Sequence, residues 1–217
     1  MDRRHFVRTV GVGAVGLAAG CAESTSDTPP APDAGAARAD AGRADAGAEP
    51  VDAGAEPVDA GASCRATGDD IQGPYYREGI PVRADLDRYD DDGEPLRLEG
   101  TVTDRACRAL AGAVVVIWHA DPAGGYDMDS PERRYYGQVA ADGQGRFAFT
   151  TLMPGRYLNG DTYRPAHLHV KVFVEGVERL TTQLYFEGDP YNATDPFFEA
   201  DRSMPVRDGA AAYDLVV

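Results

Sequence analysis

Short apolar or alternating runs recur between turn-forming residues in the last two thirds of the chain. In residues 96–103 apolar side chains alternate with polar ones, as in a strand with one buried face. Residues 114–118 are apolar throughout, which is typical of a strand buried on both faces. Asp142–Gly145 lies between two runs and predicts a hairpin turn. The predicted strands are residues 96–103, 113–119, 136–140, 146–151, 167–174, 180–186 and 212–217.

These strands define the fold class. About seven strands with turns between them, and no helical period longer than about two turns, predict an all-β domain built as an antiparallel β-sandwich. We place this domain at residues 64–217, which is long enough for one hydrophobic core. The two segments before it have a different composition and are interpreted separately.

The first 20 residues have the pattern of an export signal. Arg3 and Arg4 begin an Arg-Arg-His-Phe-Val sequence that resembles a twin-arginine signal, and a short apolar stretch follows. The Ala-Gly-Cys sequence that ends at Cys21 resembles a lipobox, with cleavage without lipidation as the alternative. We therefore expect an exported protein, periplasmic or at the cell surface, attached to a bacterial membrane through lipidated Cys21.

Residues 21–63 have the composition of a disordered linker. Asp-Ala-Gly occurs five times and aromatic residues are absent, so no core can form. The chain has a formal charge of −15, and its domain alone carries sixteen basic and twenty-six acidic residues. Such an acidic domain argues against nucleic acid as a partner. The two cysteines that remain, Cys64 and Cys107, are a disulfide candidate in an oxidising compartment, with two free thiols as the alternative.

Two histidines lie two residues apart in a predicted strand. Side chains alternate along a strand, so His167 and His169 point to the same face, close enough to bind one metal ion. Alone, such a pair is often only polar surface. Here Tyr157 follows Pro-Gly-Arg upstream, and Tyr126 follows Gly-Gly. The histidine pair therefore indicates a metal site, and the two tyrosines in the neighbouring motifs strengthen that interpretation. Copper or zinc at the histidine pair is an alternative.

Seven short motifs follow one another along the domain. They are Gly73-Pro-Tyr-Tyr76, Gly112-Ala113 with Trp118 and Ala120, Gly125-Tyr126, Asp142 with Gly145 and Phe147, Pro154-Gly155 with Tyr157, Arg164-Pro-Ala-His-Leu-His169, and Thr182-Gln183 through Pro190. In this order they resemble the intradiol ring-cleavage dioxygenases from about Cys64 to Phe198. The chain is most similar to the β-subunit of protocatechuate 3,4-dioxygenase and its exported relatives.

The resemblance implies non-haem Fe(III) as the cofactor, with Tyr126, Tyr157, His167 and His169 as its ligands. A hard trivalent ion favours anionic oxygen donors. Two phenolates and one hydroxide would balance its charge in a buried site. Tyr157 would be the ligand that leaves the metal, and takes a proton, when the substrate binds.

The implied activity is the cleavage of a catechol-type diol by O2 between the two hydroxyl-bearing carbons, to a cis,cis-muconate. Arg164 would stabilise negative charge that develops on the substrate, and Gln183 would orient bound oxygen. Without the resemblance, Arg164 could pair with Asp161, and Gln183 could be a solvated strand residue. His119 is expected to be structural. The partners implied are the catechol and O2, and an oligomer is compatible with the sequence.

A non-enzymatic sandwich is the alternative from a different class. The Gly112-Ala113 motif and the Asp142 to Phe149 motif fit a carboxypeptidase-regulatory or transthyretin-like domain equally well, which would act as a surface binding module. That alternative does not require the two tyrosines and two histidines together.

Overall fold

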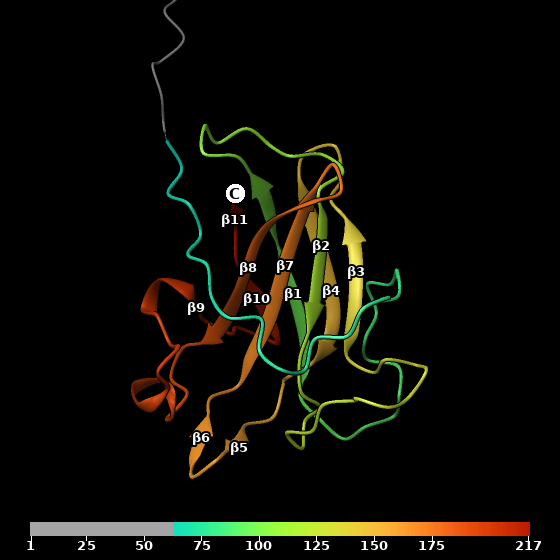
Figure 1. Cartoon of the computed structure of the whole chain (residues 1–217), viewed down its shortest axis with the longest axis vertical. Helices are drawn as coiled ribbons and strands as arrows, with labels where there is room; N and C mark the ends of the chain where they lie inside the picture. The colour runs from blue at the N-terminus through green and yellow to red at the C-terminus, as the bar shows by residue number, and fades with distance from the viewer. Residues whose placement is uncertain (1–62) are drawn as a thin grey trace, which may run out of the picture. The chain divides into compact units, whose positions relative to one another are not determined.

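The computed structural model describes residues 63–217, so the predictions for the export signal, for lipidated Cys21 and for the linker up to residue 62 lie outside the described residues. Strands dominate this part of the chain (Figure 1). No helix within it is long and apolar enough to cross a membrane. The elements are β1 (Pro95–Thr103), β2 (Val114–Trp118), β3 (Tyr136–Ala140), β4 (Arg146–Leu152), β5 (Tyr157–Asn159), β6 (Thr162–Arg164), β7 (His167–Val174), β8 (Val177–Phe186), η1 (Asn192–Thr194), η2 (Ala200–Arg202), β9 (Ser203–Met204), β10 (Ala210–Ala212) and β11 (Leu215–Val216).

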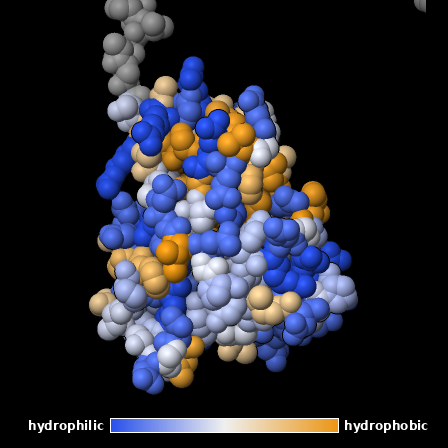
Figure 2. Space-filling view, in the orientation of Figure 1, coloured by the Kyte–Doolittle hydropathy of each residue, from blue (hydrophilic) through white to orange (hydrophobic). Residues whose placement is uncertain are grey.

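Two main sheets enclose the core. One contains β1 with β4, β10 and β11, and the other has the strand order β3-β2-β7-β8-β9. Leu96 and Leu98 of β1 and Leu168 and Val170 of β7 belong to one buried cluster, so both sheets contribute a face to it. On the face seen in Figure 2 the surface is mostly hydrophilic, with hydrophobic side chains in separate patches. The all-β prediction is confirmed.

The prediction of a purely antiparallel sandwich is wrong at the sheet edges. Strands β10 and β11 pair with β1 in the parallel direction, and β9 pairs with β8 in the same way. These edge strands are only two or three residues long. They are too short for alternation along the sequence to indicate a partner or a direction. The expected strand at residues 212–217 is also divided, because the backbone N–H of Thr101 donates to the Asp214 side chain.

The turn predicted at Asp142–Gly145 forms, but it does not close a hairpin. The backbone N–H of Gly145 donates to the Asp142 carbonyl over 2.9 Å. Strand β3 pairs with β2, whereas β4 pairs with β1. The turn therefore carries the chain from one sheet to the other. Turn residues indicate where the chain reverses, and they carry no information about which sheet the next strand joins.

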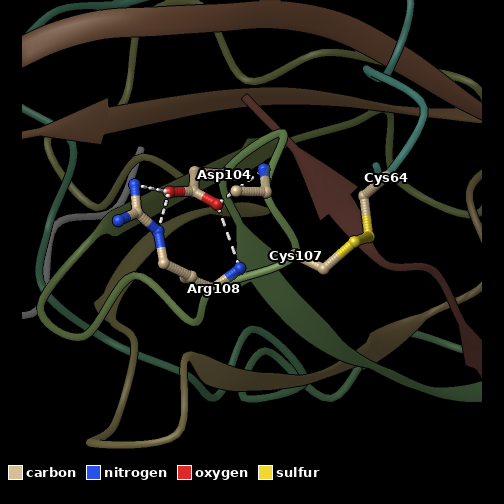
Figure 3. Close-up of a disulfide and its surroundings, with 5 residues drawn as sticks. Cys64, Asp104, Cys107 and Arg108 are labelled. Atoms are coloured by element: carbon tan, nitrogen blue, oxygen red, sulfur yellow. Dashed lines mark hydrogen bonds and ion pairs between the residues drawn. A yellow bond between two sulfur atoms is a disulfide. The ribbon is translucent and has the colours of Figure 1, made fainter. Parts of the chain in front are cut away.

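A disulfide bonds Cys64 to Cys107, as the sequence predicts (Figure 3). Cys107 lies in a turn in which the Asp104 carboxylate accepts the backbone N–H groups of Ala106 and Arg108, each over 2.9 Å. The bond thus ties the start of the described chain to the turn that follows β1. From Cys64 the chain runs beside β8 and then crosses the five-stranded sheet (Figure 1).

We expect removal of this disulfide to destabilise the domain. The bond closes a loop of 43 residues, which in the chain-entropy model stabilises the folded state by up to about 4 kcal/mol. Denaturant unfolding with and without a thiol reductant measures the difference. A Cys64→Ser/Cys107→Ser variant is the control, because reductant should not alter its unfolding. Equal stability of the oxidised and reduced wild-type protein would contradict the prediction.

Candidate metal centre

Four aromatic rings converge at one end of the β7 strand. The ring centroids lie 5.5 Å apart for Tyr126 and Tyr157, and 5.6 Å apart for Tyr157 and His167. The centroids of His167 and His169 lie 4.9 Å apart, and those of His169 and Tyr126 lie 6.1 Å apart. We call these four neighbouring rings the tyrosine–histidine circuit. The structure therefore brings together the four residues that the sequence nominates as metal ligands.

Strand geometry positions three of these residues. His167 and His169 alternate with Leu168 along β7, so that their rings share one face while Leu168 packs into the core. Tyr157 begins β5, and Arg164 ends β6. The two are cross-strand partners in this two-stranded sheet. The β5–β6 hairpin, which projects from the lower end of the domain in Figure 1, thus brings Tyr157 and Arg164 to the site together.

The loop that carries Tyr126 packs closely on the segment before Tyr157. Gly124 has a φ of +90°, and a Cβ there would lie 2.4 Å from the Arg156 carbonyl oxygen. The backbone N–H of Gly155 donates to the Asp121 carbonyl over 2.9 Å. Only glycine permits this backbone conformation at such a close approach. The Gly-Gly sequence therefore allows the two tyrosines to meet.

Stacking fixes the orientation of two of the rings. Trp118 stacks on His169 with centroids 4.8 Å apart, and Tyr75 stacks on Tyr126 with centroids 4.1 Å apart. Gly73 has a φ of +72°, and a Cβ there would lie 3.1 Å from Cε1 of His169. The sequence identifies the motifs that contain Trp118 and Gly73 but gives neither residue a place at the site. Their contacts join segments far apart in the chain, which a local pattern does not report.

Unpartnered buried atoms show that these residues fit a metal ion. Both ring nitrogens of His169 are buried and have no hydrogen-bond partner. The buried Tyr126 Oη has none other than the neighbouring Tyr157 phenol. Such groups normally find one. Nδ1 of His167 lies 2.7 Å from the Pro165 carbonyl oxygen. That oxygen can only accept, so Nδ1 carries the proton and the lone pair is on Nε2. Within residues 63–217 no three His, Cys, Asp or Glu side chains form a metal cluster.

Burial sets the charge of these groups. It lowers the pKa of His167 to about 3, with a further contribution from the Arg164 charge, and the pKa of His169 falls well below its usual value. Both imidazoles are therefore neutral, which is the form that binds a metal. Burial, with the neighbouring Tyr157 phenol, raises the pKa of Tyr126 well above 10. Only a strong positive charge at its oxygen would ionise this phenol at neutral pH.

Arg164 lies beside the site and is almost completely buried. Its partner is Asp195, at 2.7 Å between Nε and Oδ2, so the interpretation of a pair with Asp161 is wrong. Nη1 lies 3.4 Å from Tyr157 Oη and 3.4 Å from Nε2 of His167. Burial alone would lower the pKa of the guanidinium, but the hydrogen bond to Asp195 raises it above its usual value. A permanent cation therefore faces the tyrosine–histidine circuit.

Gln183 is fully buried, so the interpretation of it as a solvated residue is wrong. Its Oε1 accepts from Nη2 of Arg164 over 2.9 Å, and its Nε2 donates to the Ile71 carbonyl over 3.0 Å. The side chain is held between Arg164 and the N-terminal segment of the domain. One amide hydrogen remains beyond the bond to Ile71.

A cavity of about 420 Å³ opens beside the two tyrosines. Its lining residues are Tyr75, Ala123, Gly124, Gly125, Tyr126, Arg156, Tyr157, Leu158 and Tyr163. A larger cavity of about 640 Å³ lies along β1 and β4 and includes none of the four converging residues. The smaller cavity therefore gives access to the two tyrosines of the site.

Comparisons with known proteins agree with this geometry. A family model described as Dioxygenase matches residues 71–215. A chlorocatechol 1,2-dioxygenase of Pseudomonas putida is 41% identical over 57% of this chain and 55% of its own length. A catechol 1,2-dioxygenase of Acinetobacter lwoffii is 33% identical over 56% and 51%. The chain thus spans about half the length of the curated relatives it matches.

A solved structure is similar over nearly its full length. It is the dioxygenase domain of a dioxygenase–carbohydrate-binding protein fusion from the cellulolytic bacterium Streptomyces sp. SirexAA-E, with 36% identity, a TM-score of 0.65, and coverage of 70% of this chain and 98% of that one. The chlorocatechol 1,2-dioxygenase of Pseudomonas putida gives 36% identity, a TM-score of 0.64 and coverages of 70% and 72%. The finer affiliation to the protocatechuate 3,4-dioxygenase β-subunit stays a prediction.

Proposed function

The chain belongs to the intradiol ring-cleavage dioxygenase family, and from that premise we propose that it cleaves a catechol-type diol with O2 between its two hydroxyl-bearing carbons. The observation that carries the proposal is the pair of unpartnered buried nitrogens of His169, which lies beside His167 and the two buried phenols of Tyr126 and Tyr157. The comparisons give no support to the alternative of a non-enzymatic binding module.

The proposed metal is Fe(III), held by Tyr126, Tyr157, His167 and His169. Bound there, it would act as a Lewis acid that takes both catechol oxygens as ligands and makes the ring reactive toward O2. The two neutral imidazoles and two phenol oxygens suit such a hard ion better than copper or zinc, since half of the donors are oxygens that can become anionic.

The residues of the chain would handle protons and charge. Tyr157 lines the cavity, and its Oη lies 3.4 Å from Nη1 of the Arg164 cation, so we expect it to accept one catechol proton. Arg164 Nη1 would then face the negative charge that develops on the substrate. Gln183 holds Nη2 of Arg164 through its oxygen, and its free amide hydrogen would orient oxygen bound at the site.

Product analysis tests the proposal. Incubation of the purified, iron-containing protein with catechol and ¹⁸O2 should give a muconate that contains both labelled atoms.

The resting protein should contain about one iron per chain and absorb broadly in the visible, because phenolate donates charge to Fe(III). Tyr126→Phe should lose much of that absorption. A yellow semialdehyde product would show extradiol cleavage, and stoichiometric zinc in a colourless protein would exclude the proposed metal.

We also propose that the domain works outside the cytoplasm, attached through a lipid on Cys21. The disulfide between Cys64 and Cys107 supports export, because such bonds persist in oxidising compartments. Radiolabelled fatty acid incorporation in cells tests the anchor, with Cys21→Ala as the unlabelled control.

A further inference from the structure

The carboxylate of Asp195 fixes the plane of the Arg164 guanidinium. Asp195 Oδ2 accepts from Nε over 2.7 Å, and Oδ1 accepts from Nη2 over 3.2 Å. These two bonds occupy one edge of the guanidinium. The third nitrogen, Nη1, is left to face Tyr157 Oη and Nε2 of His167, each at 3.4 Å. The direction in which Nη1 points therefore depends on the opposite edge being held.

Asp195 is itself rigidly placed. Its side chain is fully buried, and it is the C-cap residue of η1. Its Oδ1 also accepts the backbone N–H of Phe197 over 2.8 Å. The Phe197 ring lies against the guanidinium, with 4.9 Å between Cζ of Arg164 and the ring centroid. The buried Asp195 carboxylate and the half-buried Phe197 ring thus hold the arginine from two sides.

The other hydrogen-bond partners of Arg164 are neutral. Gln183 Oε1 and Tyr185 Oη accept from Nη2, over 2.9 and 3.3 Å. They satisfy the same nitrogen that Asp195 Oδ1 binds, and neither contacts Nε. Within the described part of the chain, Asp195 is the residue that holds Nε. Gln183 and Tyr185 therefore cannot replace it in setting the guanidinium plane.

We propose that Asp195 is a positioning residue for the reaction, which aims Nη1 of Arg164 at the place where negative charge grows on the substrate. This rests on the proposed function. A carboxylate that only neutralised a buried cation would contribute to folding but would not fix the direction in which Nη1 points. The bidentate contact, the fixed carboxylate and the orientation of Nη1 together assign it the additional role.

A double-mutant cycle tests the assignment in the full-length, iron-loaded protein. Asp195→Asn should keep iron and the visible absorption but lower kcat by about 10- to 100-fold, with a much smaller change in KM. In an Arg164→Ala background the same substitution should change kcat by less than about twofold, because the group it positions is gone. Equal losses in both backgrounds, or a wild-type kcat for Asp195→Asn, would overturn the proposal.

Asp91→Asn is the matched control. Asp91, like Asp195, pairs with an arginine, in this case Arg134, and it accepts a further hydrogen bond from Tyr135. Its kcat should stay within about twofold of wild type, because none of these side chains belongs to the converging set. If Asp195→Asn does not fold, Asp195→Glu replaces it. That variant keeps the charge but moves the carboxylate by one methylene, so a loss of kcat with retained iron is expected, and a wild-type kcat would contradict the proposal.

An NMR measurement on the full-length, metal-free protein separates this proposal from the proposed function. The Nε–H of Arg164, assigned by its absence in Arg164→Lys, should give a slowly exchanging signal that is lost in Asp195→Asn. An unchanged, protected signal in that variant overturns the positioning role, whatever the enzyme does. If the signal is lost in Asp195→Asn but the wild-type protein cleaves no catechol, the proposed function is refuted and the positioning of Arg164 by Asp195 stands.

Discussion

His169→Ala should abolish both iron binding and ring cleavage. The structure leaves both ring nitrogens of His169 buried without a partner, so the imidazole has no other polar role among the described residues. Its low pKa keeps it neutral and able to coordinate. Its loss would remove one of the two nitrogen donors. We expect less than about a tenth of the wild-type iron content, measured by elemental analysis, and activity reduced in proportion or further.

The metal-free stability of this variant should change little. Truncation leaves a cavity against Trp118, which stacks on the ring, but it also removes two unpaired buried nitrogens. The two effects oppose each other, so the change in unfolding free energy should stay within about 2 kcal/mol. Thermal unfolding of the two metal-free proteins measures it. Wild-type iron content in folded His169→Ala would remove this residue from the ligand set.

His119→Gln is the control for the loss of a buried histidine. Both nitrogens of His119 are occupied, by the Ala120 carbonyl oxygen at 2.7 Å and by Thr151 Oγ1 at 2.8 Å. Burial lowers its pKa to about 4, so this ring is also neutral. These contacts agree with the structural role expected from the sequence. The variant should lose stability but retain iron in the fraction that folds, which is the reverse of the pattern expected for His169→Ala.

The sequence predicts the long strands well because each carries its own signal. In residues 167–174 the two histidines face the site, whereas Leu168 and Val170 face the core, and the structure has β7 over the same residues. Strand β8 begins at Val177, three residues earlier than predicted, and follows a turn in which Glu175 and Gly176 have φ of 52° and 76°. The parallel edge strands are not predictable in this way, because two or three residues are too few to show an alternation of apolar and polar side chains.

The candidate site is predictable in part, for a different reason. The His-x-His spacing alone places two imidazoles on one face, whereas the two tyrosines are identified by resemblance to a family. Asp195 escapes prediction because it lies 31 residues from Arg164 in a short irregular segment. An acidic residue among Pro and Phe is the one available hint. Partners of this kind depend on the tertiary fold rather than on local pattern.

Arg164→Ala should give a protein that keeps its iron and colour but turns over about 10² to 10³ times more slowly, a loss of about 2.7 to 4 kcal/mol of transition-state stabilisation. Burial alone would lower the pKa of the guanidinium, but the hydrogen bond to Asp195 raises it, so Arg164 carries a full positive charge. Its Nη1 faces Tyr157 and His167, but a protonated guanidinium has no lone pair with which to coordinate a metal. Removal therefore takes charge stabilisation from the reaction and leaves the donor set intact. Stopped-flow measurement of ring opening, with iron content on the same sample, checks both parts.

Arg164→Lys makes this test sharper. Lysine keeps the positive charge but has a single side-chain nitrogen. It therefore cannot form two parallel hydrogen bonds to Asp195 and also direct a third nitrogen at Tyr157, as Arg164 does. If charge alone matters, the lysine variant should recover most of the lost turnover. If orientation matters as well, as the bidentate contact to a fully buried carboxylate indicates, recovery should be no more than about tenfold. A normal turnover of Arg164→Ala with several catechols would show that the cation does not act in the reaction, and the proposed roles of Arg164 and Asp195 would then fall together.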